Sequence, residues 1–142
     1  MKNKNESDAE SEIRSAEFYT PHSAISTPQL KGRTKKFALD VIRLVEGLPP
    51  SYTGQVLGRQ LLRSATSVGA NYRAACRAKS AADFIAKMGI VEEEADECIY
   101  WMELLGETQL AQPEKLQPLM TEADELVAIT VASIRTAKEN KK

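Results

Sequence analysis

Apolar residues recur at intervals of three and four over most of the chain, in four stretches that Gly, Pro and Ser interrupt. The third stretch is the most regular. Its apolar positions are Phe84, Met88, Val91, Ala95, Cys98, Met102 and Leu105. Successive positions are four and three residues apart in turn, which makes an unbroken heptad seam along one helix. Ser80 and Asp83 have capping-box spacing before it, and Gly106 follows it, so a helix is predicted between Ser80 and Gly106.

The other three stretches predict helices over about 33–48, 53–79 and 118–139. Their apolar stripes are Phe37, Val41, Leu44 and Leu48; then Leu57, Leu61, Ala65, Val68, Tyr72 and Ala75; then Leu119, Ala123, Leu126, Thr130, Ser133 and Ala137. Because proline is tolerated only in the first turn of a helix, we expect Pro118 to begin the last helix, after a separate short turn from Pro113.

The second of these stretches is unusually rich in small residues. They are Ser64, Ala65, Ser67, Gly69, Ala70, Ala74 and Ala75. Small side chains let a neighbouring helix approach closely, whether it belongs to the same chain or to another subunit. Close packing also accounts for Gly69, which lowers helix propensity.

Residues 1–29 have no sustained apolar period and are rich in Ser, Thr, Asn and Glu. They cannot bury enough apolar surface to offset the entropy of ordering, so a disordered N-terminal tail is predicted. Residues 30–142 are predicted to form an all-α domain, an antiparallel up-down-up-down four-helix bundle.

Composition places the chain among ordinary globular proteins, with 42% hydrophobic and 27% charged residues. No apolar run approaches the roughly 18 residues of a membrane span, and no signal peptide is evident, so no membrane association is expected. Cys76 and Cys98 lie within helical patterns and form no Cys-x-x-Cys pair. Reduced, half-buried thiols in a cytoplasmic protein are the expectation.

Charge is segregated by helix. Residues 52–79 carry five basic side chains and no acidic one, whereas residues 80–107 carry one Lys and eight acidic side chains. Arg59, Arg63, Arg73 and Arg77 share the face opposite the apolar stripe and are called the arginine stripe below. Three interpretations remain open. Both charged faces are simply solvated, or the arginines pair with the acidic helix within or between subunits, or they bind phosphate.

The sequence shows no motif of catalytic residues. The sequence contains no Glu-x-x-His motif, no Gly-rich phosphate loop, no zinc-ligand spacing and no Ser–His–Asp set, and its single histidine, His22, lies in the predicted tail. We therefore expect a protein that is not an enzyme, with no cofactor, no metal and no small-molecule substrate.

Three segments together resemble a known family. They are LLRSATSVGANYRAA at 61–75, SAADFIAK at 80–87 and EEADECIYWMELL at 93–105. The chain resembles the bacterial four-helix-bundle proteins of the 23S ribosomal RNA intervening-sequence family. The resemblance implies an up-down-up-down bundle in a ring of five subunits. It also implies kinship with the accessory protein of diversity-generating retroelements, which binds nucleic acid and a reverse transcriptase.

The sequence thus favours a non-enzymatic homo-oligomer, a pentamer by the resemblance, that associates with RNA or a ribonucleoprotein. RNA or a reverse transcriptase are the expected partners besides the chain itself. The nucleic-acid-binding candidates are Arg59, Arg63, Arg73 and Arg77, and the candidates for pairing within the bundle or at an interface are Arg63, Asn71, Arg73, Glu93, Glu94 and Glu97. The alternative is a protein-binding ring or scaffold whose arginine stripe is used in subunit contacts.

Overall fold

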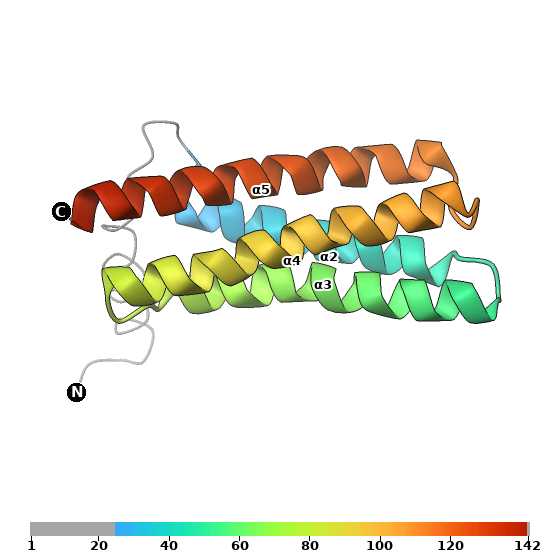
Figure 1. The fold of residues 1–142 in the computed structure, drawn as a ribbon, viewed down its shortest axis with the longest axis horizontal. Coiled ribbons are helices and arrows are strands. Elements are labelled where there is room, and N and C mark those ends of the chain that lie inside the picture. The colour runs from blue at the N-terminus through green and yellow to red at the C-terminus, as the bar shows by residue number, and fades with distance from the viewer. Residues whose placement is uncertain (1–24, 142) are drawn as a thin grey trace.

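The computed structural model describes residues 25–141, which form four helices and no strand (Figure 1). They are α2 (Thr27–Glu46), α3 (Tyr52–Cys76), α4 (Ala81–Glu107) and α5 (Pro113–Lys141). Successive helices run in opposite directions and are joined by short connections, as predicted for an up-down-up-down bundle. Most of the predicted tail, residues 1–24, lies outside the described residues. None of the described helices is both long enough and apolar enough to cross a membrane.

The predicted apolar stripes form the core, except that Leu44, Leu48 and Leu57 are half-buried at its edge. All seven residues of the α4 heptad seam are buried, and Met88, Ala95, Cys98, Met102 and Leu105 are completely inaccessible. The α5 stripe from Leu119 to Ala137 is buried throughout, including Thr130 and Ser133. These two hydroxyls donate to the carbonyls of Leu126 and Ile129 one turn earlier, which satisfies them inside the core.

Helix α2 begins earlier than the sequence predicted. The Ser26 hydroxyl accepts the Gln29 N–H, and the Gln29 side chain accepts the Ser26 N–H at 2.9 Å, which is a reciprocal capping box. Pro28 occupies the first turn, where its missing N–H costs nothing, and Leu30 is only 2% exposed. The helix therefore starts at Thr27 rather than 33, and residues 27–29 of the predicted tail belong to the bundle.

Helix α5 is continuous through Pro118, so the predicted break before this residue is wrong. The Lys115 and Leu116 N–H groups already donate to the Gln112 carbonyl, which means that the helix is established before the proline. Pro118 forfeits one hydrogen bond to the Glu114 carbonyl, and its ring lies on the exposed side of the helix. Water can hydrate the freed carbonyl there, so the helix continues.

Helices α3 and α4 begin at serine caps. Ser51 accepts the Gly54 N–H at 2.9 Å, and Ser80 accepts the Asp83 N–H at 3.0 Å. The Asp83 carboxylate bonds the Lys87 ammonium and the Lys79 N–H, which lowers the Asp83 pKa from its ordinary value. Helix α2 passes beside Gly69, where a built Cβ would lie 3.4 Å from the Thr34 hydroxyl, which is an ordinary van der Waals distance, so close packing alone does not require glycine at this position.

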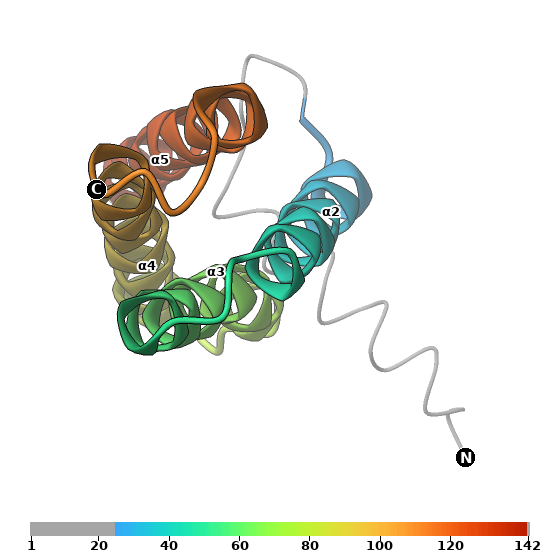
Figure 2. The ribbon, with the colours of Figure 1, turned by 90° about the vertical axis from the view of Figure 1, so that its right-hand side faces the viewer.

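Seen from one end, the helices surround a common axis in the order α2, α3, α4, α5 (Figure 2). Helix α3 packs extensively against both α2 and α4, and α4 packs against α5. The α2–α5 side is the least closely packed of the four neighbouring pairs. A cleft opens on this side of the bundle.

Candidate interaction surfaces

Arg63 connects α3 to α4. Its Nη2 lies 2.9 Å from Glu97 Oε1, and its Nη1 lies 3.4 Å from Glu94 Oε1. The Trp101 indole N–H donates to the same Glu97 oxygen at 3.2 Å. The hydrogen bond to Glu97, with the negative charge of Glu94, raises the pKa of Arg63 above its already high ordinary value. Arg63 therefore meets the acidic helix within its own chain.

The other three arginines of the stripe have a different environment. Arg59, Arg73 and Arg77 are exposed, and none of them takes part in an ion pair formed within residues 25–141. At about 100° per residue, Arg63 points toward the α4 side of the stripe, Arg59 and the C-cap residue Arg77 lie near its centre, and Arg73 points toward the α2 side. The register of α3 against α4 therefore neutralises one arginine and leaves three on the outer surface.

The predicted interface set is only partly assembled in one chain. Arg63, Glu94 and Glu97 come together, with Glu94 Oε2 buried and without a hydrogen-bond partner among the described atoms. The Asn71 amide donates to the Ser67 carbonyl at 2.8 Å, so it serves its own helix. Arg73 and Glu93 are exposed on the outer surface, and a role for them between subunits stays a prediction.

A second ion-pair cluster was not anticipated from the sequence. Arg33 on α2 donates from Nε to Glu122 Oε1 of α5 at 2.9 Å and also pairs with Glu125. The hydrogen bond to Glu122 is the main cause that raises the Arg33 pKa. The sequence feature that could have revealed this cluster is the pair Glu122 and Glu125, which stand three residues apart on one face of the last helix. Glu94 and Glu97 have the same spacing. This cluster ties α2 to α5 on the side where these helices pack least closely.

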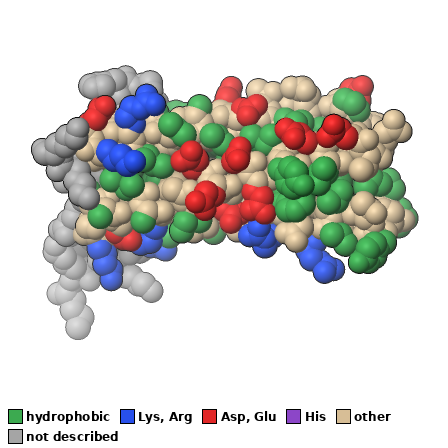
Figure 3. All heavy atoms as spheres, viewed as in Figure 1, with side chains coloured by type: hydrophobic (Ala, Val, Ile, Leu, Met, Phe, Trp, Pro, Cys, Tyr) green, Lys and Arg blue, Asp and Glu red, His purple; other side chains and the backbone are tan. Residues whose placement is uncertain are grey.

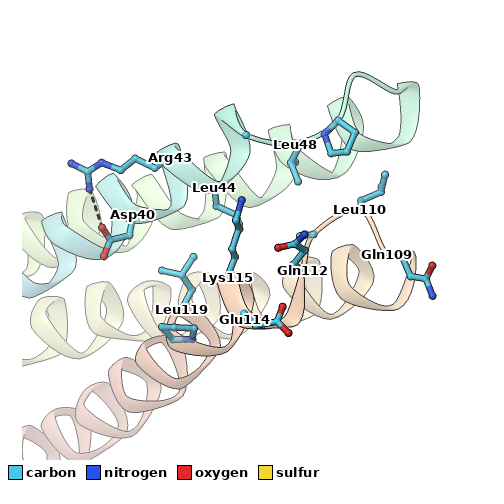
Figure 4. Close-up of a pocket in the computed structure, with 14 residues that line it drawn as sticks. Asp40, Arg43, Leu44, Leu48, Gln109, Leu110, Gln112, Glu114, Lys115 and Leu119 are labelled. Carbon is cyan, nitrogen blue, oxygen red and sulfur yellow. Dashed lines mark hydrogen bonds and ion pairs between the residues drawn. The ribbon is translucent and has the colours of Figure 1, made fainter.

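A cleft of about 590 Å³, called the α2–α5 cleft below, lies between the last turns of α2 and the first turns of α5 (Figure 4). Its apolar lining comes from Leu44, Leu48, Pro49, Leu110, Ala111, Pro118 and Leu119. Charged groups line it as well, and the Lys115 side chain extends from α5 toward Leu44 (Figure 4). Asp40 and Arg43 pair at 3.0 Å on α2, and Glu114 and Lys115 lie on α5. The cleft is large enough for several apolar side chains.

The described residues show no arrangement suited to a metal. No group of three or more His, Cys, Asp or Glu side chains within residues 25–141 is placed to hold an ion. Cys76 and Cys98 form no disulfide and are fully buried, rather than half-buried as predicted. Burial, with the nearby Glu94 and Glu97, raises the pKa of the Cys98 thiol to about 12, so the reactive thiolate is strongly disfavoured.

Comparison with known proteins agrees with this architecture. The family model described as 23S rRNA-intervening sequence protein matches residues 29–132. A solved structure of a protein of unknown function from the S23 ribosomal protein family of Bacteroides thetaiotaomicron is 33% identical, with a TM-score of 0.73. The match covers 78% of this chain and 99% of that one. No curated protein matches. The chain belongs to the 23S rRNA-intervening sequence protein family.

Proposed function

We propose that this protein is a non-enzymatic, homo-oligomeric bundle in the cytoplasm that associates with RNA or a ribonucleoprotein. The observation that carries the proposal is the division of the arginine stripe. Arg63 is neutralised by Glu94 and Glu97, whereas Arg59, Arg73 and the C-cap residue Arg77 lie exposed along α3, which contains no acidic residue. Guanidinium groups bind phosphate oxygens through two parallel hydrogen bonds, which suits an RNA backbone.

The chemistry of the stripe favours binding over catalysis. An arginine side chain stays protonated at all physiological pH values, so it attracts phosphate but takes no proton from a substrate. Contacts to phosphate position a protein on nucleic acid without reading its sequence. The proposed contact is therefore with the RNA backbone, and any choice of a particular RNA would come from its shape or from a bound protein such as a reverse transcriptase.

Self-association would strengthen such binding. Three arginines per chain are a small electrostatic surface, but several copies multiply the phosphate contacts on one RNA and raise the effective concentration of each. Exposed apolar side chains on the outer face of α3 and α4 support association of copies. A ring of five subunits is the arrangement that we propose from the family resemblance.

The second candidate is a protein-binding ring or scaffold. It is favoured by the Arg63 contacts, in which acidic side chains of α4 satisfy an arginine of α3. Exposed acidic residues of α4, such as Glu93, Asp96 and Glu103, would then pair with Arg59, Arg73 and Arg77 of the next subunit. In that case subunit contacts, rather than RNA, would use the stripe.

Two measurements on the full chain test the proposal. Light scattering gives the mass at micromolar concentration, and titration of a fluorescein-labelled RNA hairpin at rising salt gives the affinity. We expect an oligomer whose log affinity falls linearly with log salt concentration. A monomer would contradict the assembly, and failure to bind the hairpin at low salt would contradict the RNA association in favour of the scaffold.

A further inference from the structure

An apolar, aromatic surface lies on the outer face of α3 and α4. Tyr52 is 83% exposed, Tyr100 53% and Val56 41%, and the half-buried Trp101 has its ring centroid 5.0 Å from that of Tyr100. Figure 3 shows hydrophobic side chains gathered toward the end of the bundle where α3 begins and α4 ends. These four residues are called the aromatic patch below. Exposed Tyr and Trp side chains of this kind are typical of the energetically important part of protein interfaces.

The aromatic patch and the α2–α5 cleft lie at the same end of the bundle on different faces. The patch follows the first turns of α3 and the last turns of α4, whereas the cleft is bounded by the last turns of α2 and the first turns of α5. The short connections after α2 and after α4 are at this end (Figures 1 and 2). One chain therefore presents an exposed apolar patch and a partly apolar cleft at the same end of its axis.

We propose that the aromatic patch of one copy docks into the α2–α5 cleft of a second copy. Apolar rings match the leucine and proline lining of the cleft. Glu103 is exposed beside the patch and Lys115 lines the cleft, so opposite charges can meet beside an apolar centre.

The contact is head-to-tail because its two halves are different surfaces. Such a heterologous contact repeats from copy to copy and closes into a ring when the rotation allows it. In a closed ring every copy has both its patch and its cleft covered. The inference rests on the self-association in the proposed function and deepens it by assigning the two surfaces that meet.

Two exposed positions allow the contact to be broken without disturbing the fold. Tyr100→Lys places a charge in the patch between Asp96 and Glu103, which support a lysine on the same helix face. Pro118→Lys places a charge in the cleft, restores the missing backbone N–H and stands four residues from both Glu114 and Glu122. The matched controls are Ile90→Lys, 42% exposed on α4 but outside the patch, and Thr121→Lys on α5 outside the cleft.

Light scattering of the variants, singly and mixed, decides the matter. We expect Tyr100→Lys alone and Pro118→Lys alone to be folded monomers by circular dichroism and mass, and both controls to keep the wild-type mass. An equimolar mixture of the two variants should form dimers and nothing larger, because only the patch of the Pro118→Lys copy and the cleft of the Tyr100→Lys copy remain intact.

Each other result overturns the inference. Variants that retain the wild-type mass, or monomeric variants that fail to form dimers when mixed, would exclude this contact while leaving self-association standing. Loss of the oligomer in the controls as well would mean that the effect is not specific to the two surfaces. A monomeric wild type would overturn the proposed self-association and this inference together.

Discussion

Arg63 of α3 and Glu97 of α4 form an ion pair across the outer seam of the bundle, with 2.9 Å between Nη2 and Oε1. The same carboxylate oxygen accepts the Trp101 indole N–H, so the pair also fixes an aromatic side chain of the aromatic patch. Arg63, which the sequence suggested for RNA binding or for a subunit contact, thus already forms ion pairs within one chain. This relationship separates Arg63 from the rest of its stripe.

The first prediction concerns the coupling of this pair. Arg63→Gln and Glu97→Gln should each lower the melting temperature slightly, and the double variant should be destabilised by less than the sum, because the two charges depend on each other. The effect should be much smaller than that of a core truncation, since the Arg63 side chain is 52% exposed. Thermal melting of all four proteins measures the coupling, and strict additivity would refute the interaction.

The second prediction concerns the heptad seam. Met102 lies on the α4 seam and is completely buried. Met102→Ala should therefore destabilise the fold by about 2–5 kcal/mol, because the variant buries less apolar surface and leaves a cavity. Glu103→Ala, at the next and exposed position, should change stability by less than about 0.5 kcal/mol. Urea denaturation followed by circular dichroism compares the two. Equal effects at both positions would mean that the seam does not face the core.

The seam was fully predictable because burial along a helix follows a period that the sequence displays directly. The start of α2 was missed although Ser26 and Gln29 have capping-box spacing, because the prediction followed the apolar stripe from Phe37 and not the cap. The break at Pro118 was wrongly predicted, because the rule on proline in helices does not consider whether the carbonyl that loses its hydrogen bond faces water. The sequence therefore contains the signal for the start of α2, whereas the continuation of α5 depends on solvent exposure.

The candidate surfaces depend on contacts between helices. Charge segregation was visible in the sequence, but the register of α3 against α4 selects Glu94 and Glu97 as partners of Arg63 and leaves Glu93 outside. The α2–α5 cleft arises because two helices far apart in the sequence pack loosely at one end. No periodicity within a single helix encodes that spacing.

The third prediction concerns the end of α4. Gln109 has a φ angle of 61°, in the left-handed region that favours glycine. It lies in the turn after α4, where the Leu110 N–H donates to the Leu105 carbonyl. Gln109→Gly should raise stability by about 0.5–1 kcal/mol, because relief of the backbone strain outweighs the added flexibility of the unfolded chain. Gln112→Gly, at an exposed position in the same connection, is the control. A destabilised Gln109→Gly protein would contradict the strain.

The fourth prediction concerns alkaline pH. The Cys98 thiol has a pKa of about 12 in the folded chain against an ordinary value of 9.0, so it binds its proton more tightly when folded. The stability that it contributes should be complete below about pH 9 and should fall as the pH rises toward about 12. Melting temperatures at about pH 8 and about pH 10 should therefore differ more for the wild type than for Cys98→Ala. An identical pH dependence would contradict the raised pKa.

The salt dependence of RNA binding tests the central claim most directly, with Arg59, Arg73 and Arg77 changed together to Gln. The titration uses the fluorescein-labelled hairpin, with Arg63→Gln as the control because that arginine is already paired. We predict that the triple variant keeps its mass and melting temperature while the slope of log affinity against log salt becomes shallower by about 0.9 for each phosphate group that the variant no longer binds. The control should retain the wild-type slope. A triple variant with unchanged mass, unchanged melting temperature and undiminished RNA affinity would contradict the account.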